Sequence, residues 1–576
     1  MKRYPILGRS VLVVGLSCIA LSACVGSSAQ AQTRLSVALG FENCTTPGCY
    51  APATIDVENL APSETARLQI VQAVGNEWRG EAEMRIELPQ SIQSDGTYTS
   101  VIPVYDPANA VQFELWSSTG ELLTEATLDL REGFRASPFP VYDRALPRFD
   151  DRAALVDVGR LPTDWWGYDS AESVWIASSL PDEGWATLAQ WVLAGGSLVI
   201  VTGSDFYRMD TSALRGLLPI EDPYVAVSDS GTSYVSGTFA MQNVQLVAGD
   251  GFPLLIQTEN GAGTVSLVTV RAGALTATEL SQIAEHVPNA QLIRFDEITS
   301  SLLGAQRVAT LNKPMLLLLM GLGIAMVAGV TVAGRRNPRW GWIGIGAGMA
   351  VITVLSGLMA NPTDQLVGVY AYNTDVTLLT EVGIKVVSSS LYSRTDQSFR
   401  QTYPGDLIPN VSLPRTLTGA DSYSAFAGSS SSQWLVMPGE VRDWHAYAAA
   451  IPLLHVHRED AATVRISNFH PTEFSDAWVI VDGYVHTLDS LIEGTRRYEI
   501  GSTGTRLARF LVESGDRPYR SAAQLLDNVG LLVALEDGVW LVASAVQERT
   551  AEDGVSQKVR DLTMVIARDG GGMYAY

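Results

Sequence analysis

The stretch Trp191–Phe206 reads WVLAGGSLVIVTGSDF and decides how the middle of the chain folds. Its glycine pair is typical of the end of a helix, and the apolar run SLVIV predicts a strand covered on both faces. The run ends in a tight turn at Gly203, Ser204 and Asp205. Several α/β enzymes present a nucleophile at such a turn, so the stretch raises the question whether an active site lies here.

The segments around this stretch repeat its organisation. Continuous apolar runs alternate with segments in which apolar residues have helical spacing. Strand, helix and strand in this order predict a βαβ unit, so we expect an α/β domain over 136–312. The predicted strands are 153–159, 173–179, 197–203 and 265–270, and the predicted helices are 182–193 and 277–287.

Three motifs carry a resemblance to a known family: SAESVWIASS (170–179), WVLAGGSLVIVTG (191–203) and ENGAGTVSLVTV (259–270). Together they resemble the class I glutamine amidotransferase-like fold, a flavodoxin-like α/β architecture. The similarity is to its non-catalytic members in uncharacterised bacterial membrane proteins and in accessory proteins of ABC exporters of the gliding-motility type. The resemblance implies a role in a membrane complex rather than glutamine hydrolysis.

The catalytic residues that this fold requires are missing. An amidotransferase needs a cysteine at the turn and a histidine that makes the thiolate. Here Ser204 takes the turn, no cysteine follows Cys49, and His286 is the sole histidine of 136–312. We therefore expect a degenerate turn, no enzymatic activity and no cofactor. The rival hypothesis is a hydrolase that uses Ser204 as its nucleophile.

The region 32–135 consists of short alternating runs separated by turn residues, which predict an immunoglobulin-like β-sandwich. Cys44 and Cys49 form a lone close pair, and we expect a disulfide rather than a metal site. The predicted strands include 53–59, 66–74, 83–88, 99–105, 110–116 and 126–130.

The N-terminus predicts export. Basic residues precede an uncharged run over 10–23, which is typical of a signal peptide, here 1–31. Two cleavage sites compete. A lipobox would leave Cys24 lipidated, and an ordinary site lies at Ala29-Gln30-Ala31.

Two uncharged segments, 315–333 and 340–360, predict a transmembrane hairpin, since each can cross a hydrocarbon core of about 30 Å. A buried hairpin in a soluble core is the alternative. The loop 334–339 carries three arginines, which places it in the cytoplasm and both large regions outside. We thus expect a two-pass protein of the bacterial cytoplasmic (inner) membrane, with the lipid bilayer as one partner. The loop arginines are Arg335, Arg336 and Arg339.

Small residues at spacing four follow one face of each span. Such faces let helices approach closely, either within the hairpin or against a second membrane protein as partner. The spans hold no ionisable residue, which favours an anchor over an ion path. The small residues are Gly321, Ala325 and Gly329 in the first span and Gly344 and Gly348 in the second.

The region 361–576 returns to short strand patterns and predicts an extracytoplasmic β-rich domain. The serine-rich segment GSSSSQW (428–434) is typical of a flexible loop. The net charge of −22 argues against nucleic acid as a partner. The predicted strands are 382–390, 462–468, 477–481, 538–546 and 561–567.

Three further groups are candidates for binding. His455 and His457 alternate along a strand and could hold zinc with a third ligand, although a solvated strand face is the favoured interpretation. Trp165 and Trp166 could stack on a sugar, or pack within the protein. The pair Asp150-Asp151, flanked by Arg148 and Arg152, indicates a solvated loop.

These observations predict a multidomain, non-enzymatic, membrane-anchored binding or assembly protein. It would be an extracytoplasmic accessory or sensing component of an exporter-like complex. A surface binder of glycan or peptide is the alternative, and a hydrolase or metalloenzyme is a third.

Overall fold

The computed structural model describes residues 32–293, 369–513 and 538–569, together with 329, 331, 335 and 535. Of the described residues, 52% lie in strands and 16% in helices. Gaps within the three ranges fall at 63, 77–79, 106–109, 132–134, 381, 394–396, 405–406, 408–409, 412–421, 427–428, 437–440, 451–452, 489, 501–503 and 551–557.

The N-terminal region forms two antiparallel sheets around one apolar core. Along β2 the side chains of Ala53, Ile55 and Val57 are buried, while those between them are only partly covered. This alternation follows from the two-residue period of a strand and turns one face of β2 towards Ile70 and Phe113. The strands are β1 (Arg34–Leu39), β2 (Cys49–Glu58) and β5 (Gly96–Val104) in one sheet, and β3 (Ala66–Asn76), β4 (Gly80–Ile92), β6 (Val111–Ser117) and β7 (Leu122–Leu128) in the other.

The second of these sheets continues into the C-terminal region. β4 pairs in parallel with β21 (Ser422–Phe426), which pairs with β22 (Ser429–Val436), and β22 pairs with β19 (Gln397–Pro404). The serine-rich segment therefore forms most of β22, and its prediction as a flexible loop is wrong. Backbone pairing on both edges satisfies the N–H and C=O groups of β22 whatever its side chains are.

The middle of the chain forms a seven-stranded mixed sheet. Its strands lie in the order β14 (Val244–Val247), β15 (Pro253–Asn260), β16 (Gly263–Val268), β11 (Ser197–Val201), β10 (Ala171–Ile176), β8 (Phe139–Asp143) and β9 (Ala154–Val156). The strands from β16 to β9 are parallel, and β14 and β15 are antiparallel. All five residues of β11 are buried, as its apolar run predicts.

Helices cover both faces of this sheet. The helix α2 (Asp182–Leu193) connects β10 to β11 and buries Trp185, Leu188 and Val192 against one face. The helix α5 (Ala277–His286) buries Leu280 and Ile283 against the other. The remaining short elements are η1 (Val158–Arg160), η2 (Trp165–Tyr168), η3 (Gly203–Asp205), α3 (Phe206–Met209), α4 (Ser212–Leu217), η4 (Met241–Asn243), η5 (Ala272–Ala274) and the hairpin strands β12 (Glu221–Val227) and β13 (Ser233–Thr238).

The C-terminal region forms a nine-stranded sheet against which a three-stranded sheet packs. Val456 and Ile466 of the smaller sheet contact the buried cluster of the larger one. The large sheet has the order β20 (Asn410–Val411), β23 (Val441–Ala449), β18 (Gly383–Ser393), β17 (Val369–Leu379), β31 (Lys558–Arg568), β30 (Val539–Thr550), β26 (Asp476–Val481), β27 (Tyr484–Leu488) and β29 (Thr505–Arg506), followed by helix α9 (Leu507–Glu513). The small sheet has the order β24 (Leu454–Arg458), β25 (Thr463–Asn468) and β28 (Gly494–Glu499).

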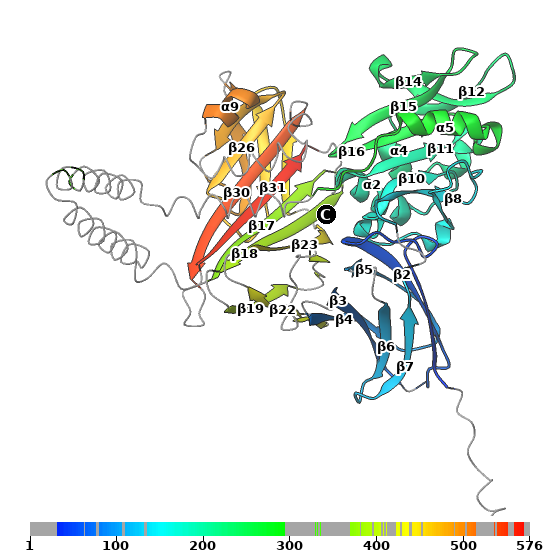
Figure 1. Ribbon diagram of the computed structural model, residues 1–576. Coiled ribbons are helices and arrows are strands. Elements are labelled where there is room, and N and C mark those ends of the chain that lie inside the picture. Colours follow the sequence, from blue (N-terminus) through cyan, green and yellow to red (C-terminus); the bar gives the residue numbers. More distant parts are fainter. Residues whose placement is uncertain are drawn as a thin grey trace, which may run out of the picture.

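One core joins the N-terminal, middle and C-terminal regions. A single buried cluster contains Tyr50 and Val101 of the first sheet, Trp191 of α2, and Tyr447 and Trp478 of the nine-stranded sheet. Figure 1 shows the three parts meeting near the middle of the molecule. Regions that are far apart in the sequence thus bury their apolar side chains against one another.

The predicted fold class is wrong. Most of the described residues lie in strands, and the helices are short segments that cover or connect the sheets. This composition conflicts with the predicted α/β fold. Among the residues that the structure describes, no helix is long and apolar enough to cross a membrane. This finding contradicts the predicted transmembrane hairpin and the two-pass location in the bacterial inner membrane.

Most of the residues on which those predictions rested lie outside the described part. Gly329 and Arg335 are described, and both are helical and exposed. The signal peptide 1–31 with Cys24, the packing residues Gly321, Ala325, Gly344 and Gly348, and the loop residues Arg336 and Arg339 are not described.

The predicted disulfide is also wrong. Cys44 and Cys49 are both buried, and no bond joins them in the structure. Backbone hydrogen bonds close this loop instead, because Phe41 and Cys44 pair with each other and the Cys49 N–H donates to the Thr46 carbonyl. Buried thiols of this kind pack as small apolar side chains.

Candidate functional site

The predicted nucleophile turn has the backbone of a sharp strand-to-helix connection. Gly203 follows β11 with a φ of +59°, and a Cβ at this position would overlap the backbone of Arg271. Only glycine fits here without displacing that backbone. Phe206 and Met209 are buried and hold α3 against the sheet, which leaves Ser204 exposed on the outside of the turn.

Among the described residues, no hydrogen bond joins the Ser204 side chain to a basic group. The helix α5 begins after the carboxyl end of β16 and runs back along the sheet, so that its ten residues span about 15 Å. His286 is its last residue, and the ring Nδ1 lies 2.9 Å from the carbonyl of Gln282. The His286 carbonyl accepts the Gln257 side chain at 3.0 Å, and no hydrogen bond joins His286 to Ser204 in the described part of the chain.

A buried carboxylate at the end of β8 has both oxygens engaged in hydrogen bonds. Asp143 ends β8 and is 3% exposed. One oxygen accepts the backbone N–H of Ala145 at 2.9 Å and the other accepts that of Ala177 at 3.1 Å. The side chain thus ties the carboxyl ends of β8 and β10 together.

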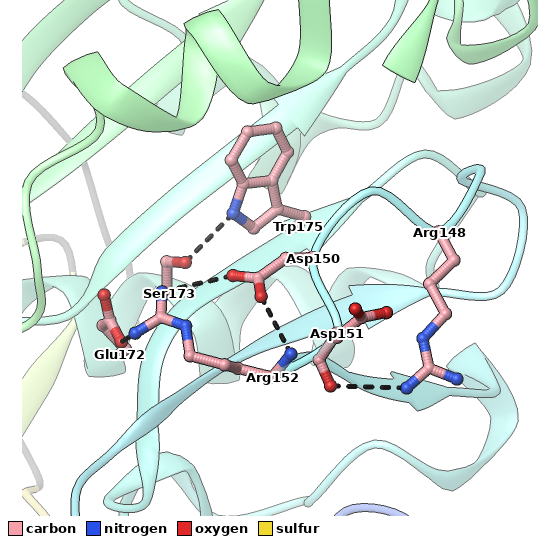
Figure 2. A network of polar contacts seen from close by, with 7 residues as sticks. All are labelled: Arg148, Asp150, Asp151, Arg152, Glu172, Ser173 and Trp175. Atoms are coloured by element: carbon pink, nitrogen blue, oxygen red, sulfur yellow. Dashed lines mark hydrogen bonds and ion pairs between the residues drawn. The ribbon is translucent and has the colours of Figure 1, made fainter. Parts of the chain in front are cut away.

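The pair Asp150-Asp151 lies in a network of polar contacts between β8 and β9. Figure 2 shows Asp150 turned towards Arg152, with Asp151 on the side of Arg148. Asp150 accepts the Arg152 guanidinium at 3.2 Å, and the same guanidinium lies 3.7 Å from Glu172. Asp151 accepts Arg148 through its main-chain oxygen. The two carboxylates do not converge, so the network anchors the loop to β10.

Aromatic rings lie beside this network. Tyr142 stacks on Phe149 with ring centroids 4.6 Å apart, and Trp175 meets both rings edge to face. Burial, followed by the charge of Asp150, raises the pKa of Tyr142 well above its usual range. A tyrosine held neutral in this way packs as an apolar side chain with a polar end.

Trp165 and Trp166 do not form an open aromatic surface. Trp165 is 0% exposed and packs on Tyr447 with ring centroids 4.7 Å apart. Its indole nitrogen donates to the Ala448 carbonyl at 3.2 Å. Trp166 is partly buried against the same core. Burial therefore leaves Trp165 no ring face for the stacking of a sugar, which the sequence had left open.

Polar contacts continue across the same junction. The Tyr50 hydroxyl donates to the His445 carbonyl at 3.3 Å, and the Tyr447 hydroxyl donates to the Ile293 carbonyl at 3.3 Å. Gln190 of α2 donates to the carbonyl of Gly383 at 3.2 Å. Each bond joins two of the three regions, which restricts their relative movement.

His455 and His457 lie on the exposed face of β24, as their spacing predicts. The Nδ1 of His457 lies 3.2 Å from a carboxylate oxygen of Asp569, and its cross-strand neighbour is Arg465. A cation opposite the pair disfavours a metal. Among the described residues, no group of three histidine, cysteine, aspartate or glutamate side chains could hold a metal ion.

A shallow groove of about 380 Å³ runs along β1, lined in part by Arg34, Asp56 and Glu58. Its charged side chains are of opposite sign, and the Asp56 carboxylate also accepts the hydroxyl of Thr97 at 2.5 Å. No aromatic residue contributes to its lining, so it offers no platform for a ring or an apolar ligand.

Sequence reasoning missed that exposed apolar side chains concentrate on residues 206–260, a segment here named the outer lobe. Nine large apolar side chains are exposed in the described part of the chain, and five of them lie in this lobe. They are between 52% and 78% exposed: Tyr207 of α3, Tyr224 and Val227 of β12, Met241 of η4 and Val247 of β14. In Figure 1 the lobe lies at the periphery, away from the N-terminal and C-terminal sheets.

Specific contacts hold the β12–β13 hairpin in this lobe. Tyr234 of β13 stacks on Phe252 with ring centroids 4.8 Å apart, and its hydroxyl donates to both carboxylate oxygens of Asp250 at 2.9 and 3.0 Å. Desolvation and this bond raise the pKa of Tyr234 to about 12. Desolvation opposes ionisation of Asp250, but hydrogen bonds led by Tyr234 outweigh it and hold its pKa below the usual range. The lobe therefore presents its apolar residues on an ordered frame.

Most charged residues of the outer lobe are acidic. Between 216 and 270 the sequence contains no lysine or arginine. Arg208 lies on α3 beside the apolar residues, and Arg215 is paired with Asp210 at 2.5 Å. The acidic residues of this segment are Glu221, Asp222, Asp229, Asp250 and Glu259.

Comparison with protein-family models finds no match for the chain, and comparison with curated proteins finds none either.

Proposed function

We propose that this protein is a non-enzymatic binding and assembly protein that holds a protein partner at its outer lobe. The observation that carries this proposal is the gathering of Tyr207, Tyr224, Val227, Met241 and Val247 in one peripheral lobe. Soluble surfaces rarely concentrate exposed apolar side chains unless a partner covers them. Aromatic residues and methionine are also enriched at the centre of protein interfaces.

Two further observations support a binding role over catalysis. In the described part of the chain no hydrogen bond joins Ser204 to a histidine, and the His286 ring contacts the Gln282 carbonyl instead. The shared core around Trp165 makes a rigid body of three regions, which suits a scaffold that holds one surface in a fixed position.

The test is a comparison of two matched triple variants of the full chain in affinity purification. One variant carries Tyr224→Ser, Val227→Ser and Met241→Ser in the outer lobe. The control carries Leu122→Ser, Phe469→Ser and Ile492→Ser, which change exposed apolar residues elsewhere. We expect a partner at fixed stoichiometry that the control retains and the lobe variant loses. Equal recovery of partners by both variants would contradict the proposed site.

An enzymatic role is tested separately with Ser204→Ala. We expect this variant to retain partner binding and thermal stability, because the Ser204 side chain is exposed. Loss of a hydrolytic activity in Ser204→Ala, with the fold intact, would overturn the non-enzymatic proposal.

A further inference from the structure

We propose that two copies of this chain pair through β1, antiparallel and across a two-fold axis, so that their three-stranded sheets join into one continuous sheet. This inference goes beyond the proposed function and uses a different surface, because β1 belongs to the N-terminal region and the outer lobe to the middle region. The feature that carries it is an edge strand that is regular, almost uncharged and open on its outer side.

The outer side of β1 carries backbone groups that no described residue pairs with. The strand lies at the edge of its sheet and pairs with β2 in an unbroken register from Arg34 to Leu39. In an antiparallel pair the N–H and C=O groups of every second residue point away from the neighbouring strand. Within the described part of the chain, no backbone hydrogen bond reaches 34–39 from that outer side. The groove of about 380 Å³ lies along this strand, lined in part by 32–36 and by Thr124 of β7.

β1 lacks the devices that protect other edge strands of this protein from pairing. Such devices are proline, charged side chains, bulges and groups that cover the edge. At the opposite edge of the same sheet, β5 contains Pro103. The Leu155 N–H of β9 is covered by the Glu42 carboxylate at 3.0 Å, and β7 and β14 have shifts in register. β1 has no proline and no shift, and its single charged residue is Arg34 at its start.

The inward side chains of β1 are only partly covered by their own sandwich. Leu35 and Val37 pack against the core but stay partly exposed. Their cross-strand neighbours on β2, Val57 and Ile55, are 1% and 0% exposed. A strand added outside β1 would lay its own inward side chains beside Leu35 and Val37, and removing this apolar surface from water favours the addition.

The β1 strand of a second copy is complementary to this edge. Residues directly opposite each other in an antiparallel pair have their side chains on the same face. With Ser36 on the two-fold axis, Leu35 lies opposite Val37 of the second copy and Arg34 lies opposite Ala38. Apolar residues thus meet apolar ones, and no like charges face each other. Two-fold contacts between identical surfaces are also the commonest arrangement of soluble homo-oligomers.

The dimer should be weak and should tighten with salt. Six residues from each copy are far fewer than the 20–30 of a standard interface, so we expect a Kd of about 10–500 µM by sedimentation equilibrium of the full chain. Each copy carries a net charge of −22, and the two copies repel each other. Because salt screens this repulsion, the Kd should fall at least about threefold between ionic strengths of about 0.05 and 0.5 M.

Matched variants assign the association to β1. Ser36→Lys should raise the Kd at least about tenfold, because two lysines would meet on the axis, whereas Ser36→Ala should leave it unchanged. Thr99→Lys changes an exposed residue of β5 at the opposite edge and should have no effect. Ser36 is exposed as well, so the unfolding temperature checks that each variant keeps its fold.

Cross-linking tests the register. Directly opposed residues of an antiparallel pair have Cα atoms about 4.5–5.5 Å apart, within the range of about 4.4–6.8 Å that a disulfide requires. Ser36→Cys should therefore give a covalent dimer on mild oxidation, seen on a non-reducing gel. Thr99→Cys should give no more dimer than the unchanged chain, which is the baseline for the native cysteines.

Outcomes that overturn the inference differ from those that overturn the proposed function. A chain that stays monomeric up to about 0.5 mM would overturn it, and so would self-association that Ser36→Lys leaves intact. A covalent dimer formed by Thr99→Cys but not by Ser36→Cys would place the contact at β5 instead. The variant Tyr224→Ser, Val227→Ser and Met241→Ser should dimerise normally, so loss of a partner by that variant tests the outer lobe alone.

Discussion

The indole nitrogen of Trp165 donates a hydrogen bond to the carbonyl of Ala448, 3.2 Å away in space and 283 residues later in the chain. This bond joins the short helix η2 of the middle region to β23 of the nine-stranded sheet. Tyr447 packs on the same indole, and Tyr50 from the N-terminal sheets packs on Tyr447 with ring centroids 5.5 Å apart. These aromatic contacts therefore bring residues of all three regions into one buried cluster.

Replacing Trp165 by alanine should destabilise all three regions together. Loss of a fully buried tryptophan costs about 3–5 kcal/mol of unfolding free energy, because a cavity remains. Differential scanning calorimetry should show the main transition moving to lower temperature as a whole. Trp166→Ala, at a partly buried neighbour, should cost clearly less. If Trp165→Ala showed two separate melting steps and lowered the temperature of only one of them, the common core would be contradicted.

Gly203 should be intolerant of substitution because of both its backbone and its neighbours. Alanine at a φ of +59° is strained, and its Cβ would overlap the backbone of Arg271. We expect Gly203→Ala to lower the unfolding free energy by about 2–3 kcal/mol. Gly231 has a φ of +84° with nothing within 4 Å of a built Cβ, so Gly231→Ala should cost only about 1 kcal/mol. Equal costs in urea denaturation would contradict the steric argument.

The capping box of α5 should contribute measurably to stability. The Thr276 hydroxyl accepts the Glu279 N–H at 3.2 Å, and the Glu279 carboxylate accepts the Thr276 N–H at 2.8 Å. Thr276→Ala should therefore cost about 1 kcal/mol of unfolding free energy. Ser281→Ala on the same helix is the control and should be neutral or slightly stabilising, because alanine has the higher helix propensity. A destabilisation by Ser281→Ala as large as that by Thr276→Ala would rule out a specific cap.

Stability should fall as the pH drops below neutrality, in part through His470. Desolvation lowers the pKa of this side chain, with a smaller opposing effect of Asp375, and the ring Nδ1 accepts the Thr472 N–H at 3.1 Å. A lowered pKa means that the folded state prefers the neutral ring. The stabilisation that comes from burying the neutral His470 ring is complete above the pKa of about 6.5 that the ring has in the unfolded chain. It is lost as the pH falls towards the lower pKa of the ring in the folded protein.

His470→Gln should flatten this part of the pH profile, measured as the urea midpoint at a series of pH values. His455→Gln changes an exposed histidine of the C-terminal region and serves as the control. An unchanged slope in His470→Gln would show that protonation of other groups accounts for the decline.

Local sequence patterns predict much of the strand content and the tight turn at Gly203. The alternating runs of the N-terminal region correspond to β2 through β7, and the run before Gly203 corresponds to β11. The expectation that Ser204 has no catalytic partner came from counting residue types, and it stays a prediction. The predicted fold class was wrong because strands dominate the described residues, and the predicted membrane hairpin was wrong because no described helix is long and apolar enough to cross a membrane.

The sequence by itself determined the periodicity of the strands, the tight turn at Gly203, and the acidic character of the outer lobe. These depend on neighbours in the chain or on composition alone. Tertiary structure decided that Trp165 is buried, that the serines of β22 form a strand, and that Tyr224 and Val247 remain exposed. Burial and sheet pairing depend on which distant segments come together, and no local pattern records that choice.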